Sequence, residues 1–79
     1  MSYYGQRYRY AISNHAITRA RQRLNLKAVP IYQIHELLED LIEHAICESS
    51  YEGDSIYKNL EHNVTIVVNE RDKIIKTVY

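Results

Sequence analysis

The sequence predicts an α+β fold in which two N-terminal helices pack on an antiparallel sheet of three or four strands. The first observation is a helical repeat of apolar residues that continues to about residue 48. The second is a series of three short β-prone segments after Gly53, separated by turn residues. Helices followed by strands are typical of an α+β layer architecture. A chain of this length forms a single domain, residues 1–79, with residues 1–12 as an N-terminal strand or arm.

Tyrosine and arginine alternate in the N-terminal segment Arg-Tyr-Arg-Tyr. Alternation with a period of two predicts a strand or an extended arm, on which Tyr4, Tyr8 and Tyr10 share one face. Interleaved rings and guanidinium groups also suit single-stranded RNA, because rings stack on bases and Arg binds phosphate. Arg7 and Arg9 are therefore candidates for substrate binding, although an edge strand with Arg on its solvent side is the favoured interpretation.

The first helix is expected from about residue 14 to residue 25, with Ser13 or Asn14 as its N-cap. One side of this helix is predicted to enter the core, through Ser13, Ile17, Ala20 and Leu24. Another side carries cationic residues one turn apart, at His15, Arg19 and Arg23. Such a stripe forms a surface that faces an anion, and phosphate is the obvious anion. A solvated basic helix face is the alternative.

A second helix is predicted from residue 30 to about residue 48, with Pro30 at its first position, where a missing N–H costs nothing. Its apolar residues form one broad stripe, and its acidic residues occupy the opposite face. A turn over residues 48–54 then leads to three strands, predicted at 55–60, 64–68 and 73–79. Because the loops between these strands are short, neighbouring strands should be antiparallel.

The formal net charge of zero hides an asymmetry between the two parts of the chain. Residues 1–27 contain six Arg or Lys and no acid, whereas residues 28–79 contain four Arg or Lys and ten acids. The charges of the two parts are therefore +6 and −6. This distribution predicts a basic face for an anionic partner. The alternative is that the two parts pair with each other inside the fold or across a homodimer.

Cysteine and histidine usage argues against a disulfide and against a metal site. Cys47 is the single cysteine, which rules out an internal disulfide and fits a reducing cytoplasm. His44 and Cys47 could contact one ion together, but no second pair completes the four ligands of a closed zinc site. We therefore expect no metal and no other cofactor. No apolar run approaches the roughly 18 residues that span a membrane, so no membrane partner is expected.

The cationic stripe contains the parts that metal-independent RNA cleavage requires. A base must remove the 2′-hydroxyl proton, an acid must protonate the leaving 5′-oxygen, and cations must stabilise the phosphate as charge develops. Histidine can transfer protons near neutral pH, which suits His15. A guanidinium group can bind two phosphate oxygens at once, which suits Arg19 and Arg23.

The motif Ser-Asn-His15-Ala-Ile-Thr-Arg19-Ala-Arg-Gln-Arg23-Leu and the closing Ile-Ile-Lys-Thr77-Val-Tyr79 resemble small domains of phages, mobile elements and toxin modules. These domains resemble, in turn, the barnase–EndoU–colicin–RelE superfamily of metal-independent ribonuclease toxins. The resemblance covers residues 12–79 and implies a RelE/ParE-like sheet, with a cleft between the first helix and the last strands. It implies catalytic roles for five residues, His15, Arg19, Arg23, Thr77 and Tyr79. It also adds Tyr57 to the substrate-binding residues.

The resemblance implies an endoribonuclease of the toxin type, acting on RNA phosphodiesters in the cytoplasm of a bacterial host cell. An antitoxin or immunity protein would be a further partner. The alternative is a catalytically silent phage or mobile-element protein that binds and modulates a host protein or a nucleic acid, with the acidic part as its docking surface. A transcriptional regulator is the least favoured hypothesis, because the sequence lacks a convincing helix-turn-helix.

Overall fold

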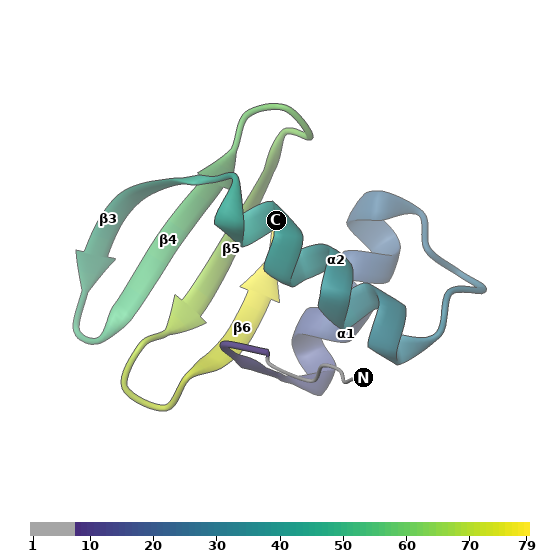
Figure 1. Ribbon diagram of the computed structural model, residues 1–79, viewed down its shortest axis with the longest axis horizontal. Helices are drawn as coiled ribbons and strands as arrows, with labels where there is room; N and C mark the ends of the chain where they lie inside the picture. The colour runs from purple at the N-terminus through teal and green to yellow at the C-terminus, as the bar shows by residue number, and fades with distance from the viewer. Residues whose placement is uncertain (1–7) are drawn as a thin grey trace.

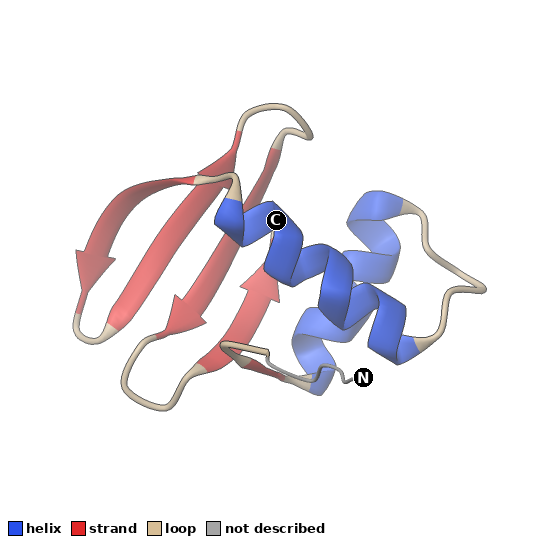
Figure 2. Cartoon of the chain, in the orientation of Figure 1, coloured by secondary structure: helices blue, strands red, loops and turns tan. Residues whose placement is uncertain are grey.

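The computed structural model describes residues 8–79, in which two helices pack on a five-stranded sheet (Figures 1 and 2). The helices are α1 (Asn14–Leu24) and α2 (Ile31–Glu43). The strands are β2 (Ala11–Ile12), β3 (Ile46–Tyr51), β4 (Asp54–Asn59), β5 (Val64–Asn69) and β6 (Ile74–Val78). Their order across the sheet is β2-β6-β5-β4-β3. The predicted α+β class is confirmed.

The sheet differs from the prediction in strand number and in one strand direction. Within the described residues it has five strands rather than three or four, and it is mixed, because β2 pairs with β6 in parallel. The other neighbours are antiparallel, as their short connections require. The predicted N-terminal strand is reduced to Ala11–Ile12 among the described residues. Tyr4 and the rest of residues 1–7 lie outside the described residues.

Helix α1 begins and ends close to the predicted positions. The Ser13 hydroxyl accepts a hydrogen bond from the Ala16 backbone N–H at 3.0 Å, and Asn25 ends the helix in the left-handed conformation, with φ of 56°. Ala16 and Ala20 are fully buried, whereas Ile17 and Leu24 are partly buried. The centre of the core-facing stripe therefore lies at the two alanines, and the sequence interpretation missed Ala16.

Helix α2 ends at Glu43, so the prediction that it continues to residue 48 was wrong. Residues 46–51 instead form β3, which pairs with β4 through a two-residue turn at Glu52 and Gly53. Both turn residues have positive φ, 52° and 88°, as a tight hairpin of right-handed twist requires. Hairpin pairing thus overrides the helical repeat, because Ile46 occupies an apolar position that suits either structure. Pro30 is the N-cap of α2 rather than its first residue.

The core lies between the helices and the sheet face formed by alternate strand residues. In β5 this face is Val64, Ile66 and Val68, all at most 1% exposed. A bulge in the β5–β6 pairing lets Ile75 and Val78 of β6 face the same side, opposite Val68 and Ile66. Four α2 side chains cover this face, namely Ile34, Leu38, Leu41 and Ile42. In the part of the chain that the structure describes, no helix is long and apolar enough to cross a membrane.

Candidate functional site

Helix α1 lies along the end of β6 where β2 no longer pairs. β2 pairs with only the first two residues of β6, so the later carbonyl groups on that side need other donors. The backbone N–H of Ser13 donates to the Ile75 carbonyl at 3.1 Å, and its hydroxyl donates to the Lys76 carbonyl at 3.0 Å. Further along α1, the Nε–H of Arg19 donates to the Val78 carbonyl at 3.2 Å. These contacts fix α1 against the last strand.

Arg19 also brings α1 to Tyr79, the residue after β6. Its guanidinium carbon lies 6.0 Å from the centre of the Tyr79 ring, and its Nη1 donates to Gln22 Oε1 at 3.1 Å. The backbone of Tyr79 exchanges hydrogen bonds of 2.8 and 3.1 Å with Thr65 of β5, and its side chain is largely exposed. The first helix and the end of the last strand therefore meet at Arg19 and Tyr79.

Arg23, one turn after Arg19, reaches the turn between β4 and β5. Its Nη2 donates to the carbonyl of Asn63 at 2.7 Å. Asn63 directly precedes β5, whose Thr65 pairs with Tyr79, so the two arginines contact neighbouring parts of the sheet. We call the region formed by Arg19, Arg23, Asn63 and Tyr79 the α1–β6 corner.

No hydrogen bond links the other two predicted catalytic residues to the α1–β6 corner. His15 is exposed in the first turn of α1, and its imidazole has no hydrogen-bond or ion-pair partner among residues 8–79. Thr77 pairs with Val67, whereas Val78 faces the core, so Thr77 lies on the sheet face opposite α2. The Thr77 hydroxyl is buried and has no hydrogen-bond partner in the described part of the chain. The structure thus brings together three of the five residues, Arg19, Arg23 and Tyr79, and gives the side chains of His15 and Thr77 no hydrogen bond to them within residues 8–79.

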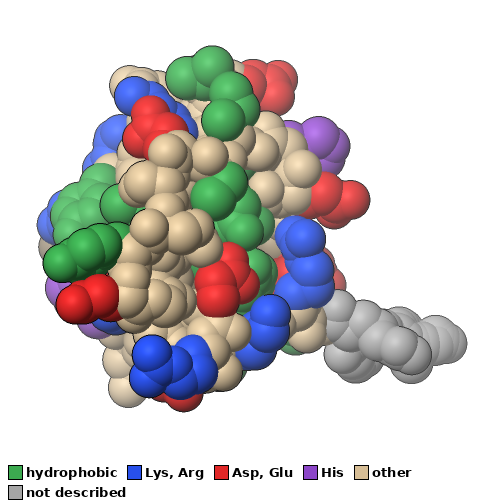
Figure 3. All heavy atoms as spheres, turned by 90° about the vertical axis from the view of Figure 1, so that its left-hand side faces the viewer, with side chains coloured by type: hydrophobic (Ala, Val, Ile, Leu, Met, Phe, Trp, Pro, Cys, Tyr) green, Lys and Arg blue, Asp and Glu red, His purple; other side chains and the backbone are tan. Residues whose placement is uncertain are grey.

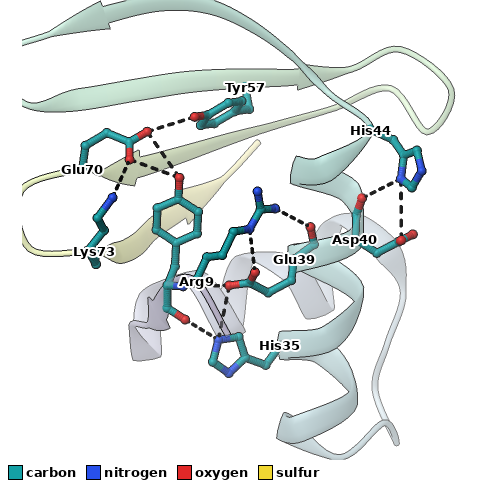
Figure 4. Close-up of polar contacts among 9 residues, drawn as sticks. Arg9, His35, Glu39, Asp40, His44, Tyr57, Glu70 and Lys73 are labelled. Carbon is teal, nitrogen blue, oxygen red and sulfur yellow. Dashed lines mark hydrogen bonds and ion pairs between the residues drawn. The ribbon is translucent and has the colours of Figure 1, made fainter. Parts of the chain in front are cut away.

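The residues predicted to bind substrate are engaged with carboxylates elsewhere. Arg9 Nε pairs with Glu39 Oε1 of α2 at 3.4 Å, and the Tyr57 hydroxyl donates to Glu70 Oε2 at 2.9 Å (Figure 4). Both side chains therefore connect structural elements. Arg7 lies outside the described residues.

Glu70 is the centre of a polar cluster that the sequence interpretation missed. The Tyr10 hydroxyl lies 3.1 and 3.3 Å from the two Glu70 oxygens. Lys73 Nζ lies 3.6 Å from the carboxylate (Figure 4). Burial acts to raise the pKa of Glu70, but hydrogen bonds from the Ser55, Tyr57 and Tyr10 hydroxyls outweigh burial and hold that pKa below its usual value. Burial raises the pKa of the Tyr10 hydroxyl, and its contacts with Tyr57 and Glu70 raise it further. In this Glu70 cluster, the Tyr10 and Tyr57 hydroxyls are neutral and donate hydrogen bonds to an ionised carboxylate.

A second carboxylate holds the segment before β2 against α2. Glu39 accepts a hydrogen bond from the Tyr10 backbone N–H at 2.8 Å, and His35 Nε2 lies 2.6 Å from the Tyr10 carbonyl oxygen. The ring of Tyr8 stacks on His35, with centroids 3.8 Å apart. The excess of tyrosine in a chain without Trp or Phe is the sequence signal for the hydroxyl contacts with Glu70, because each partly buried hydroxyl requires a polar partner.

A hollow of the described surface lies beside Glu39 and away from the α1–β6 corner. It encloses about 440 Å³ and is lined by Tyr8, Arg9, Glu36, Glu39, Asp40 and Glu43. Four carboxylates and one guanidinium give it the wrong charge for a phosphate group. The α1–β6 corner, by contrast, carries the half-buried Arg19 and the exposed Arg23.

Within the described ranges, no three His, Cys, Asp or Glu side chains are placed to hold a metal ion. His44 Nδ1 lies 3.0 Å from the Asp40 carbonyl oxygen (Figure 4), and Cys47 is an exposed free thiol on β3. The Asp40 carbonyl raises the pKa of His44, and the Asp40 carboxylate adds to this effect.

Comparisons with protein families, with curated proteins and with solved structures find no match to this chain.

Proposed function

We propose that the chain is a RelE-like, metal-independent RNA-cleaving domain that binds the RNA phosphodiester at the α1–β6 corner. The observation that carries the proposal is the contact between Arg19 and the end of β6, at Val78 and Tyr79. It brings residues from the two ends of the chain to one place. The order of two helices followed by an antiparallel meander supports a RelE/ParE-like arrangement.

The arginines of the α1–β6 corner retain donors for a phosphate group. Arg19 uses Nε and Nη1 within the protein, which leaves its Nη2 donors. Arg23 uses Nη2, which leaves Nε and Nη1. A guanidinium fixed by a backbone carbonyl is pre-oriented, so less side-chain entropy is lost when it binds an anion. The exposed Tyr79 ring offers a surface on which a base can stack.

His15 lies one helical turn before Arg19 on the same side of α1 and is exposed to solvent. In the proposed reaction, His15 removes the proton of the RNA 2′-hydroxyl, whose oxygen then attacks the adjacent phosphorus. The 5′-oxygen leaves with a proton from solvent or from a returning imidazolium, and the products are a 2′,3′-cyclic phosphate and a 5′-hydroxyl. Arg19 and Arg23 stabilise the charge that develops on the phosphate oxygens.

The test is cleavage of a fluorescent RNA in EDTA by wild type, His15→Ala and Arg23→Met. We expect cyclic-phosphate ends from wild type, and loss of a general base should lower the rate by about 10²–10⁴-fold. Arg71→Met is the matched control, because Arg71 is an exposed cation in the β5–β6 turn, away from the α1–β6 corner. Equal rates for wild type and His15→Ala would refute the catalytic role of His15.

Thr77→Val separates a structural role from a functional one. Its buried hydroxyl has no hydrogen-bond partner in the described residues, so removing the hydroxyl should leave stability unchanged or raise it. If Thr77 orients RNA, Thr77→Val lowers cleavage without lowering stability. An unchanged cleavage rate would remove Thr77 from the site.

The second candidate function is a catalytically silent protein that binds a basic host protein. The observation that favours it is the acidic hollow beside α2, which carries Glu36, Asp40 and Glu43. In this case wild type is inactive on RNA, and a charge-reversed α2 loses its protein partner.

A further inference from the structure

Among residues 8–79, strand β3 forms an outer edge of the sheet, and all six of its residues are exposed. Ile46 and Tyr51 are 57% and 73% exposed, which is high for large apolar side chains. Figure 3 views the molecule from the side on which β3 lies in Figure 1, and hydrophobic side chains are visible there between charged groups. An edge strand with free backbone groups and apolar side chains is a template for pairing with another strand.

A bulge in β3 makes the side chains of its first and last residues point to the same sheet face. The register with β4 shifts between Cys47 and Ser49, so that Glu48 is the extra residue. Ile46 and Tyr51 therefore point to the same sheet face, although an odd separation of five places residues of a regular strand on opposite faces. Cys47 and Ser50 share the other face, and their Sγ and Oγ atoms lie 4.0 Å apart.

Two residues of β3 have backbone N–H and C=O groups that point away from β4. The two-residue turn closes on the Tyr51–Asp54 pair, so the N–H and C=O of Tyr51 point toward β4 and those of Ser50 point outward. Alternation along β4 makes Cys47–Tyr57 a pair whose groups point away from each other, so the groups of Cys47 also point outward. The outward groups thus lie at Cys47 and Ser50.

From this arrangement we propose that β3 pairs antiparallel with β3 of a second copy of this chain, about a two-fold axis between Glu48 and Ser49. In this register Cys47 lies opposite Ser50 of the second copy, so that outward donors and acceptors face each other. Ile46 lies opposite Tyr51 of the second copy on one common face. In a regular strand, a two-fold axis between two residues would place side chains from different sheet faces opposite each other. The bulge at Glu48 removes this conflict. The two sheets become one continuous sheet of ten strands, given five in each chain.

The charges of β3 are compatible with a second copy as the partner. Glu48 is the single charged residue of β3 and lies opposite Ser49, so no charged residue is directly opposite another. The two Glu48 carboxylates lie on either side of the axis, and their repulsion makes the pairing tighter as salt is added.

The experiment measures molar mass by light scattering after size exclusion, over a concentration series of the full chain. Wild type should approach twice the chain mass of 9.4 kDa as concentration rises. Ile46→Lys and Tyr51→Lys should each remain at the mass of one chain. Both side chains are exposed, so neither variant should impair folding, which circular dichroism checks. Leu60→Lys, at an exposed apolar residue outside β3, is the matched control and should dimerise like wild type.

The register is tested by a charge pair. In the double variant Ile46→Lys/Tyr51→Glu, each lysine lies opposite a glutamate of the second copy, so dimerisation should return. The double variant Ile46→Lys/Tyr51→Lys should remain a single chain. A wild type that stays at one chain mass at every concentration would overturn the proposal. So would dimerisation by Ile46→Lys, loss of dimer in Leu60→Lys, or no recovery in the lysine–glutamate variant.

Discussion

Replacing Glu70 by alanine should destabilise the protein far more than its place in a surface turn suggests. Its carboxylate accepts hydrogen bonds from the hydroxyls of Tyr10 and Tyr57, and a hydrogen bond to a charged group contributes about 1.5–3 kcal/mol. The Glu70 side chain is 32% exposed, so water replaces part of the lost bonding and the lower value applies to each. Tyr10 is only 7% exposed, and its hydroxyl loses its acceptor. We therefore expect Glu70→Ala to lower the free energy of unfolding by about 2–3 kcal/mol.

The assay is urea unfolding followed by circular dichroism and tyrosine fluorescence at several pH values. Because the pKa of Glu70 is lowered in the folded state, its contribution is present above the unfolded-state pKa of about 4.3 and is lost as pH falls through the folded value. The difference between wild type and Glu70→Ala should be complete at neutral pH and should shrink on acidification. The control is Asp72→Ala, an exposed acid in the same turn, with an expected change within about 0.5 kcal/mol.

Equal stability of Glu70→Ala and Asp72→Ala at neutral pH would show that the Glu70 carboxylate does not stabilise the fold. A difference that stays constant down to strongly acidic pH would also contradict the prediction, because the stabilisation would then not come from the ionised carboxylate. A double-mutant cycle with Tyr10→Phe measures the energy of the Tyr10–Glu70 hydrogen bond, because the effects of the two substitutions should be coupled.

Three further predictions concern the sheet and its turns. Glu52→Asn should raise the free energy of unfolding by about 0.5 kcal/mol, and Gly53→Ala should lower it by about 1 kcal/mol, because both residues have positive φ. If urea unfolding gives changes of the same sign for both variants, this turn geometry is excluded. Asn59→Ala should lower the free energy of unfolding by about 2–3 kcal/mol, because the buried Asn59 amide donates to the Leu41 carbonyl at 3.1 Å and accepts from the His62 N–H at 2.9 Å. A loss below about 1 kcal/mol in urea unfolding would show that these hydrogen bonds are not maintained. Hydrogen bonds from Lys76 and Asn69 lower the pKa of Asp54, so Lys76→Met should raise that pKa toward its usual value in an NMR titration, and an unchanged titration would contradict the 2.8 Å ion pair.

The helices and the last three strands could be predicted because local signals and packing agree. Ser13 caps α1, the apolar stripe of α2 faces the core, and the alternation in Val64–Asn69 defines a buried strand. At residues 44–51 the two signals conflict, because the apolar spacing continues the helix while the Glu52–Gly53 turn requires a hairpin. Pairing with β4 decides the outcome, and pairing is not visible in a local sequence window.

The site was predictable in part for a similar reason. Helical spacing places Arg19 and Arg23 on one side of α1, but it cannot show that both donate to backbone carbonyls, at Val78 and Asn63. The Val78 carbonyl is available because β2 is too short to cover β6, whereas the Asn63 carbonyl lies in the turn between β4 and β5. The partners of Tyr10 and Tyr57 likewise lie far away in sequence, at Glu70. Residue spacing identifies which groups share a face, whereas tertiary pairing decides what they bind.

A phosphate site at the α1–β6 corner is tested most directly by the NMR shifts of arginine Nε–H signals when a short RNA is added. The RNA carries a 2′-deoxy sugar, so that it resists cleavage. We predict that Arg19 and Arg23 shift together and reach saturation at the same RNA concentration, while Arg9 and Arg71 do not shift. Added salt should weaken these shifts, because the contact is to phosphate. Unchanged Arg19 and Arg23 signals, with RNA bound at another surface or not at all, would contradict a phosphate site at the α1–β6 corner.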